Sequence, residues 1–298
     1  MMNKETSLFH KYGEFVEVPL SIKDNIAGWD DKAKDGTAEY GKKILYIIKK
    51  YKILNKQSLL KCLQIENRNS WKRDMLSKTL KSMRKVGYLS MYEMRGRPQE
   101  EQSLMIYMLT DTGVAYISNQ EEEPIEGIDI KDTQSCLSLL SLNQWHINLQ
   151  YVLEKNLVHA YYQTFVIKKN LKVPSLVQYQ RQNNAENSKR HKTSISLFTF
   201  PAPHAEEQLE QFMLKIIANY EFLIENQSYR PAIIVVLCEN MNHAAWISWK
   251  LNKVKEMRPL NAFVYALDIM TNKEQMLSLL YSCDADEEGM IRSNVSLK

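Results

Sequence analysis

Glycine, proline and cysteine are scarce in this chain of 298 residues, which contains nine, eight and four of them respectively. So little glycine and proline excludes collagen-like repeats and low-complexity segments. The cysteines Cys62, Cys136, Cys238 and Cys283 are widely spaced and form no CxxC pair. This spacing disfavours a disulfide framework and a zinc ribbon, so we expect reduced thiols buried in hydrophobic cores.

Long apolar runs and the common catalytic motifs are also absent. The continuous apolar run Ala232–Cys238 is far shorter than the roughly 18–20 residues that span a bilayer. The N-terminal stretch lacks the apolar core of a signal peptide, so we expect a cytoplasmic protein without membrane contact. No GxGxxG, GxxxxGK[ST] or GxSxG motif occurs, and no two histidines have the i, i+4 spacing of a helical metal site. We therefore expect no enzyme activity, no cofactor, no metal and no catalytic residue.

Charge is distributed unevenly along the chain. The whole chain has 39 basic and 35 acidic residues, a net charge of +4. The segment Tyr40–Ser118 alone has 11 Lys and 5 Arg against six acids, a net charge of +10, which leaves −6 for the rest. The segment Asn119–Asp132 then has six acids and one Lys, with Pro124 and Gly127. A basic domain joined by an acidic linker to a second domain is typical of a nucleic-acid-binding module with an attached partner domain.

The predicted layout follows this charge pattern. An N-terminal arm covers residues 1–39, and a first domain covers 40–118. The linker covers 119–132, a second domain covers 133–283, and a polar tail covers 284–298.

The first domain has a helical pattern that changes into short strands. A helix begins at Tyr40, a second one, Lys56–Leu63, follows the N-cap Asn55, and a third, Trp71–Val86, is capped by Ser70 and ended by Gly87. Two strand-like runs, Tyr88–Glu93 and Leu104–Leu109, flank a charged turn, and the sequence LTDTG leads into a short last segment, Val114–Ile117. This order resembles a winged helix-turn-helix domain, and LTDTG at this place is typical of bacterial winged-helix regulators.

The third helix carries the predicted DNA contacts. Its Lys and Arg side chains lie off the apolar stripe, so they can neutralise phosphates in the major groove, while arginines of the turn can enter the minor groove. The predicted DNA-binding residues are Ser70, Lys72, Arg73, Ser77, Lys78, Lys81, Arg84 and Lys85 of the helix, with Arg95 and Arg97 of the turn. A winged helix used only for protein contacts is the alternative reading.

The second domain alternates strands with helices. Strand-like runs are Val158–Lys168, Pro174–Gln180, Thr193–Phe200, Ala232–Cys238 and Ala262–Leu267. A helix precedes the first run, and further helices are predicted over Ala205–Ile224, Asn242–Met257 and Asn272–Tyr281. This order predicts a mixed sheet flanked by helices, so the chain belongs to the α+β or α/β class.

A winged helix, an acidic linker, a helix with Gln144-Trp145-His146 and an αβββαβ core together resemble the plasmid replication-relaxation family, over roughly Tyr40 to Met270. The resemblance implies a restriction-endonuclease-like fold for the second domain. It also implies a role on plasmids or other mobile elements of low-GC Gram-positive bacteria.

The nuclease motifs of that fold are missing. Such nucleases have Pro-Asp on one strand and Glu-x-Lys or Asp-x-Lys on the next, to bind magnesium and activate water. Here the first position is Pro174-Ser175, and the next strand, Ile195–Phe200, has neither acid nor Lys. A catalytically silent domain, used for dimerisation or for docking a partner, is the expected outcome.

We therefore expect a double-stranded DNA-binding protein of a mobile element that acts in replication, relaxation, conjugative transfer or transcription control. A homodimer and contact with a replication or relaxase protein are further expectations. Two alternatives remain open at this point. One is a metal-dependent nuclease with a displaced site, for which Asp268 and the glutamates after His204 are the residues to suspect. The other is a ligand-sensing repressor.

Overall fold

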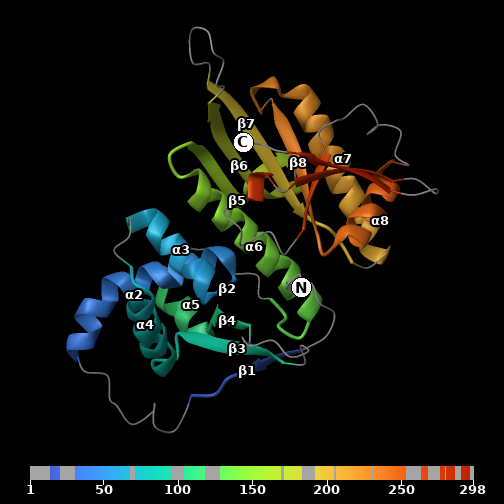
Figure 1. Ribbon diagram of the computed structural model, residues 1–298. Helices are drawn as coiled ribbons and strands as arrows, with labels where there is room; N and C mark the ends of the chain where they lie inside the picture. The colour runs from blue at the N-terminus through green and yellow to red at the C-terminus, as the bar shows by residue number, and fades with distance from the viewer. Residues whose placement is uncertain are drawn as a thin grey trace, which may run out of the picture. The chain divides into compact units, whose positions relative to one another are not determined.

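The protein has a mixed α and β fold with two separate sheets (Figure 1). The computed structural model describes residues 14–20, 31–67, 71–95, 104–117, 128–168, 171–182, 192–204, 206–229, 231–252, 263–267, 276–278, 280–285 and 290–295. These residues form two compact units that divide between residues 143 and 144. No helix that the structure describes combines the length and the apolar composition that crossing a bilayer requires.

The division lies inside helix α6 (Thr133–Leu153) rather than in the predicted linker 119–132. The difference arises because the first half of α6 packs into the core of the first unit. Residues 128–132, at the end of the predicted linker, belong to that unit too, and residues 118–127 lie outside the described ones.

The first unit contains a four-stranded antiparallel sheet of order β1-β3-β4-β2 and five helical segments. Its elements are β1 (Glu14–Glu17), α2 (Asp31–Tyr51), β2 (Ile53–Asn55), α3 (Lys56–Asn67), α4 (Arg73–Lys85), β3 (Leu89–Arg95), β4 (Met105–Leu109), α5 (Asp111–Ile117) and the first half of α6. Helix α2 begins before the predicted start at Tyr40. The N-terminal arm, for which no structure was predicted, supplies the edge strand β1, whose Glu14 pairs with Arg95 of β3.

Two of the predicted helix-terminal residues are confirmed. The Asn55 side chain accepts a hydrogen bond from the backbone N–H of Ser58 at 2.8 Å, which caps α3. Gly87 adopts φ +81° and ends α4 in the left-handed conformation that favours glycine. Helix α4 has Lys72 as its N-cap, with extended backbone and no side-chain cap, and the predicted cap Ser70 lies outside the described residues.

The LTDTG sequence builds the start of α5. The Thr110 hydroxyl accepts a hydrogen bond from the Gly113 backbone N–H at 3.1 Å and donates its own proton to the Gly87 carbonyl. A Cβ at Gly113 would lie 2.2 Å from the carbonyl oxygen of Tyr88. Glycine is therefore required at this position because α5 packs directly on the backbone between α4 and β3.

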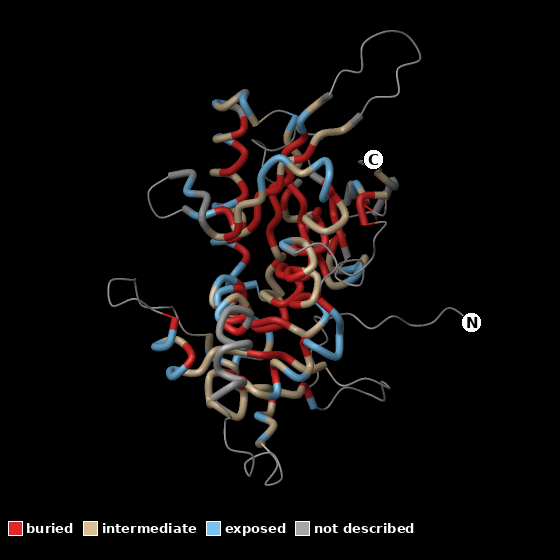
Figure 2. Tube along the Cα trace, turned by 90° about the vertical axis from the view of Figure 1, so that its left-hand side faces the viewer, coloured by how far each residue is buried: buried red, intermediate tan, exposed pale blue. Residues whose placement is uncertain are grey.

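The small sheet is covered on both faces. On one face Phe15, Ile53, Met94 and Ile106 form a cluster with the first half of α6, through Cys136, Leu137 and Leu140. The alternating residues face α2 to α5, as the contact of Arg84 in α4 with Met91 in β3 shows. Figure 2 shows buried residues concentrated along the strands and the inner helix faces.

Hydrogen bonds cap the start of α6 and connect the helix to the turn between α2 and β2. Asp132 accepts a hydrogen bond from the Ser135 backbone N–H at 3.1 Å, and the hydrogen bonds from Ser135 lower the pKa of the Asp132 carboxyl below its ordinary value. The buried Asn143 amide donates to the carbonyl oxygens of Tyr51 at 2.9 Å and of Ile53 at 2.7 Å. These two carbonyls flank Lys52, whose φ of +64° turns the chain from α2 into β2.

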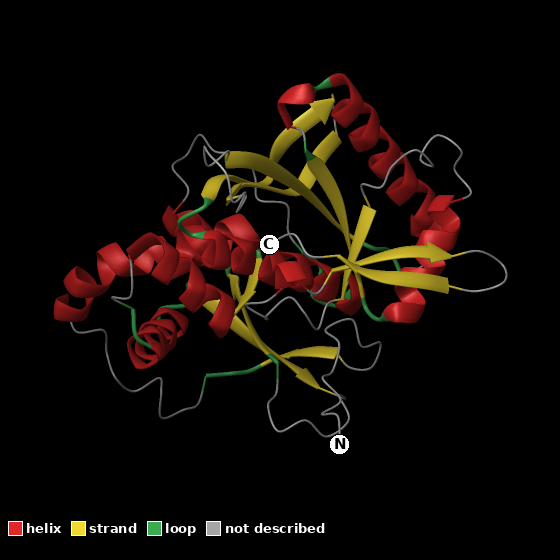
Figure 3. Cartoon of the chain, turned by 45° about the horizontal axis from the view of Figure 1, so that its top comes forward, coloured by secondary structure: helices red, strands yellow, loops and turns green. Residues whose placement is uncertain are grey.

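The second unit has a seven-stranded mixed sheet of order β11-β10-β9-β8-β7-β6-β5. Figure 3 distinguishes the strands, in yellow, from the helices, in red. Its elements are β5 (Leu157–Lys168), β6 (Leu171–Gln182), β7 (Lys192–Pro201), the 3-10 turn η1 (Glu206–Gln208), α7 (Leu209–Glu225), the 3-10 turn η2 (Gln227–Tyr229), β8 (Ala232–Cys238), α8 (Met241–Asn252), β9 (Phe263–Leu267), the 3-10 turn η5 (Met276–Ser278), β10 (Leu280–Ala285) and β11 (Met290–Val295). Strands β7, β8 and β9 are parallel, and the remaining neighbours are antiparallel. The prediction of a mixed sheet flanked by helices is confirmed.

The two faces of the large sheet differ in character. Phe198, Phe200 and Val236 face α7 and α8 in an apolar cluster that includes Phe212 and Ile247. The alternating residues face the second half of α6, where polar side chains are frequent.

The predictions for the C-terminal segment are wrong. The predicted helix Asn272–Tyr281 contains η5 and the start of β10, and the predicted polar tail contains β11. Strand β10 pairs with β11, from Leu280 opposite Val295 to Ala285 opposite Met290, and it extends the sheet next to β9. Burial of Met276, Leu277 and Leu280 in the unit outweighs the helical spacing of this segment.

We predict that Gly113→Ala lowers the free energy of unfolding by about 2 kcal/mol. The clash with the Tyr88 carbonyl costs about 3 kcal/mol as overpacking, and the better helix propensity of alanine offsets about 1 kcal/mol of it. Urea unfolding of the full chain measures the effect. Gly87→Ala is the control, since no atom lies within 4 Å of its Cβ position and only the left-handed backbone opposes it, at about 1 kcal/mol. A larger loss at Gly87 than at Gly113 would contradict the packing argument.

We predict that Asn143→Ala destabilises the protein by about 3 kcal/mol. The substitution leaves two buried carbonyl oxygens without their amide donor, at about 1–3 kcal/mol each. The urea midpoint of the full chain is the measurement. Ser138→Ala, a half-buried site on the same helix, should change the free energy of unfolding by less than about 0.5 kcal/mol. Equal midpoints for the two variants would mean that the α2–β2 turn does not depend on Asn143.

Candidate functional site

Helix α4 presents a basic surface to solvent. Its apolar residues Leu76, Leu80 and Met83 are buried in the first unit. Lys78 and Lys81 are exposed and lie three residues apart on the opposite side, and the half-buried Lys85 continues the same row. Lys72 and Arg73 are exposed where the helix begins. The structure therefore brings five of the predicted DNA-binding residues, Lys72, Arg73, Lys78, Lys81 and Lys85, onto the outward part of one helix.

The hydroxyl groups of α4 are used within the protein. Ser77, Thr79 and Ser82 each donate to the carbonyl oxygen four residues before them, at 2.8, 3.0 and 3.1 Å. The Ser77 oxygen also accepts a hydrogen bond from the Lys56 ammonium of α3. Ser77 was predicted as a donor to DNA, but its proton is committed to the helix and its oxygen links α3 to α4.

Arg84, another predicted DNA contact, points to the edge of the sheet. Its Nη2 donates to the carbonyl oxygen of Val18, which follows β1, and its Nη1 lies 3.6 Å from the Met91 sulfur. The Val18 backbone N–H in turn donates to the Met91 carbonyl at 2.8 Å. The guanidinium therefore holds the N-terminal strand against β3, and sequence alone gives no sign of this because β1 was not predicted.

The predicted turn arginines lie at or beyond the end of β3. Arg95 is exposed, and its Nε lies 3.7 Å from a carboxylate oxygen of Glu93. Arg97 and Ser70 lie outside the described residues. Acidic β1 runs along the outer side of β3, where Glu17 accepts a hydrogen bond from Ser90 at 3.1 Å, so negative charge borders this side of the unit.

Buried polar side chains of β6 and β7 contact helix α6. Ser175 is fully buried, and its hydroxyl lies 2.5 Å from Nδ1 of the buried His146 in α6. Opposite Ser175 in the sheet, Thr199 accepts a hydrogen bond from the Trp145 indole at 2.9 Å. Tyr162 lies against His146 with ring centroids 5.1 Å apart, and burial raises the pKa of its phenol. These hydrogen bonds hold helix α6 and the large sheet together.

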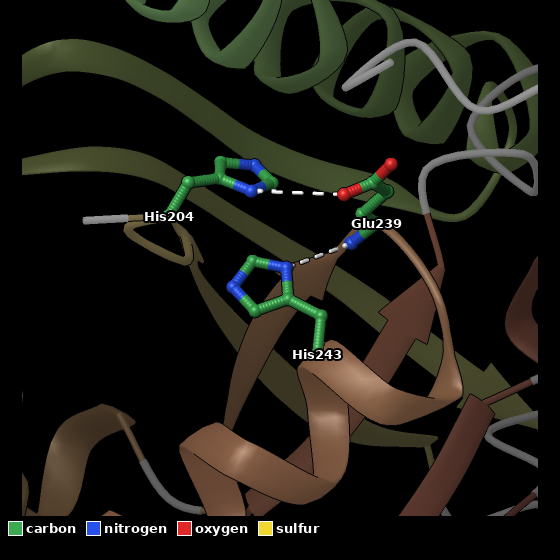
Figure 4. A group of neighbouring side chains, drawn as sticks. All are labelled: His204, Glu239 and His243. Atoms are coloured by element: carbon green, nitrogen blue, oxygen red, sulfur yellow. Dashed lines mark hydrogen bonds and ion pairs between the residues drawn. The ribbon is translucent and has the colours of Figure 1, made fainter. Parts of the chain in front are cut away.

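A second polar cluster lies at the carboxyl ends of the parallel strands β7 and β8 (Figure 4). It consists of His204, which follows β7, Glu239, which follows β8, and His243 in the first turn of α8. One candidate ligand atom from each residue lies within 4.8 Å of the other two. His204 Nδ1 is 3.7 Å from a Glu239 carboxylate oxygen, and the two imidazole centroids are 4.4 Å apart.

Sequence analysis did not anticipate the His204–Glu239–His243 cluster, because the ligand types lie far apart along the chain. A weak signal exists: Glu239 comes directly after β8 and His204 lies three residues after the end of β7, and parallel strands end at one edge of a sheet. The glutamates after His204 behave differently. Glu206 is exposed and pairs with Lys250 at 2.9 Å, and the hydrogen bond from Lys250 lowers the pKa of its carboxyl. Asp268 lies outside the described residues.

Comparison with family models, with curated proteins and with solved structures finds no match for this chain.

We predict that Arg84→Met releases β1 from β3. The substitution removes the hydrogen bonds of a charged donor, worth about 1.5–3 kcal/mol, so backbone amides such as that of Val18 should exchange with deuterium about 10–100 times faster. Hydrogen exchange with mass spectrometry measures this. Lys78→Met, an exposed site on the same helix, is the control and should leave β1 unchanged. Unaltered exchange in the Arg84 variant would show that the guanidinium does not hold the strand.

Proposed function

We propose that the protein binds double-stranded DNA through α4, as a winged helix-turn-helix protein. The observation that carries the proposal is the row Lys78, Lys81 and Lys85 on the solvent side of α4, with Lys72 and Arg73 at its start. A helix with apolar residues on one side and cations along the other can lie in the major groove while its opposite face stays in the core.

The order of elements in the first unit supports this proposal. Helix α2 is followed by the short strand β2, helices α3 and α4, and the antiparallel pair β3 and β4, with β4 next to β2. In a winged helix the second helix of the helix-turn-helix enters the groove, and here α4 takes that place after α3. The segment between β3 and β4, which contains Arg97, corresponds to the wing.

Binding should be dominated by contacts to phosphate. The outward row of α4 is made of lysines, which neutralise phosphates as point charges, whereas the planar guanidinium of Arg84 is bound to Val18 within the unit. Arg73 is exposed at the start of the helix and is the α4 residue best suited to bidentate hydrogen bonding with the O6 and N7 atoms of a guanine.

The second unit serves assembly in this proposal. Its element order, α6-β5-β6-β7-α7-β8, supports a restriction-endonuclease-like fold. In such a fold Ser175 would take the place of a metal-binding acid, and the strand Ile195–Phe200 has neither acid nor Lys. We infer a role in replication, relaxation, conjugative transfer or transcription control of a plasmid or other mobile element. The second unit would join two copies or dock a replication or relaxase protein.

The experiment is a titration of the full chain against labelled duplex DNA over a series of salt concentrations, with and without Mg²⁺. Lys78→Ala/Lys81→Ala should weaken binding by about tenfold and lower the slope of log K against log salt by about 1.8, or 0.9 for each lost phosphate contact.

Lys172→Ala/Lys215→Ala is the matched control, because it removes two exposed lysines from the second unit. It should leave both affinity and slope unchanged. Equal losses in the two double variants would mean that net charge, not α4, drives binding. Cleavage of the DNA that depends on Mg²⁺ would contradict the role assigned to the second unit.

A further inference from the structure

We propose that His204, Glu239 and His243 form a binding site for a divalent transition-metal ion, with Zn²⁺ as the representative ion. The proposal is independent of DNA binding. It rests on the close approach of two imidazoles and one carboxylate from two strand ends and a helix, with His204 Nδ1 3.7 Å from the carboxylate and the ring centroids 4.4 Å apart.

The three side chains are held by the fold. Strands β7 and β8 are parallel and adjacent, so the segments after them begin at the same edge of the sheet. His243 is positioned by the start of α8, where its backbone N–H donates to the Asn240 side chain at 3.0 Å, and its ring stacks on Trp246 with centroids 5.9 Å apart. A metal ion here would bond to three elements whose geometry is already set by backbone hydrogen bonds.

Burial favours a cation at this place. The side chain of Glu239 is only 16% exposed and that of His204 only 5%. A carboxylate removed from water is costly unless a positive charge compensates it. A divalent ion between the carboxylate and the imidazoles would supply the compensating charge.

The ring of His243 already has the tautomer that a metal site requires. Its Nδ1 accepts the Glu239 backbone N–H at 3.1 Å, so the ring proton is on Nε2 and is donated to the Pro203 carbonyl at 2.9 Å. A metal-binding histidine commonly donates its second N–H to a carbonyl in this way. Metal binding at Nδ1 exchanges the hydrogen bond from Glu239 for a metal bond, so we expect a weaker site than a preformed structural zinc centre.

The ligand types select the metal class. Imidazole nitrogen and a single carboxylate suit Zn²⁺ and its neighbours, whereas Mg²⁺ and Ca²⁺ prefer sites built from oxygen. Two histidines and one carboxylate leave a coordination position for water or an anionic group. This differs from the magnesium site of nucleases, which needs acids on the strands that here hold Ser175 and Thr199.

The test is calorimetric titration of the metal-stripped full chain with Zn²⁺ in the presence of excess Mg²⁺. We expect one saturable site per chain that Mg²⁺ does not block. Zn²⁺ at 100 times its dissociation constant should raise the thermal midpoint by about 5–10 °C. Co²⁺ should give visible absorption bands but no thiolate-to-metal charge-transfer band in the near ultraviolet. The absence of that band would show that the buried cysteines do not bind the ion.

Glu239→Gln and His243→Gln should each weaken Zn²⁺ binding by about tenfold or more, which reduces the thermal shift at the same Zn²⁺ concentration by about half or more, while the metal-free variants keep the wild-type circular dichroism. His159→Ala, an exposed histidine of β5, is the control and should bind like the wild type. The proposal is overturned if Zn²⁺ does not saturate at one site, if the Glu239 and His243 variants bind as the wild type does, or if Co²⁺ reports a thiolate.

Discussion

The turn between α2 and β2 depends on one buried side chain, and the rest of the first unit depends on that turn. Lys52 has a left-handed backbone there, and the Asn143 amide donates to the carbonyl oxygens on both sides of it. Strand β2 has only three residues before α3 begins at the cap Asn55, so the direction of α3 follows directly from the turn. The hydrogen bond from Lys56 to Ser77 then relates α3 to α4. The basic row of α4 is thus placed by a chain of contacts that starts in the core.

Some cationic side chains of the first unit hold its elements together, and others face solvent. Lys43 pairs with Glu66 at 2.7 Å, Lys42 lies over the Tyr116 ring at 5.8 Å, and Arg84 holds Val18. These cations fasten α2, α5 and β1 to their neighbours. Lys78 and Lys81 of α4 face outward instead, because the apolar side of that helix is filled by Leu76, Leu80 and Met83. The net charge of +10 in the segment Tyr40–Ser118 is therefore larger than the positive charge that a nucleic acid can contact. The direction of each side chain decides whether its charge is accessible to phosphate.

Sequence could predict those features that depend on neighbours along the chain. The Asn55 cap, the left-handed Gly87, the strands β5 to β9 and the mixed sheet follow from spacing and composition within short windows. It could not predict that Arg84 binds Val18, since the partner is 66 residues away in a strand with no clear pattern. The β10–β11 hairpin was missed for a related reason, because helical spacing competes with burial against β9. The His204–Glu239–His243 cluster requires knowing that β7 and β8 are adjacent and parallel.

The second unit contains two polar regions, and their chemistry differs because of where they lie on the sheet. Ser175 and Thr199 project from the middle of strands toward α6, where the Trp145 indole and the His146 ring form hydrogen bonds to them. This region contains hydroxyl groups, an indole and an imidazole but no carboxylate. The cluster at the ends of β7 and β8 instead contains a carboxylate with little exposure and two imidazoles. In open sheets with parallel strands, ligands bind beyond the carboxyl ends, where loops rather than a packed helix surround them. The ligand types for a metal ion therefore lie at the strand ends and not in the middle of the sheet, where Ser175 and Thr199 contact a packed helix.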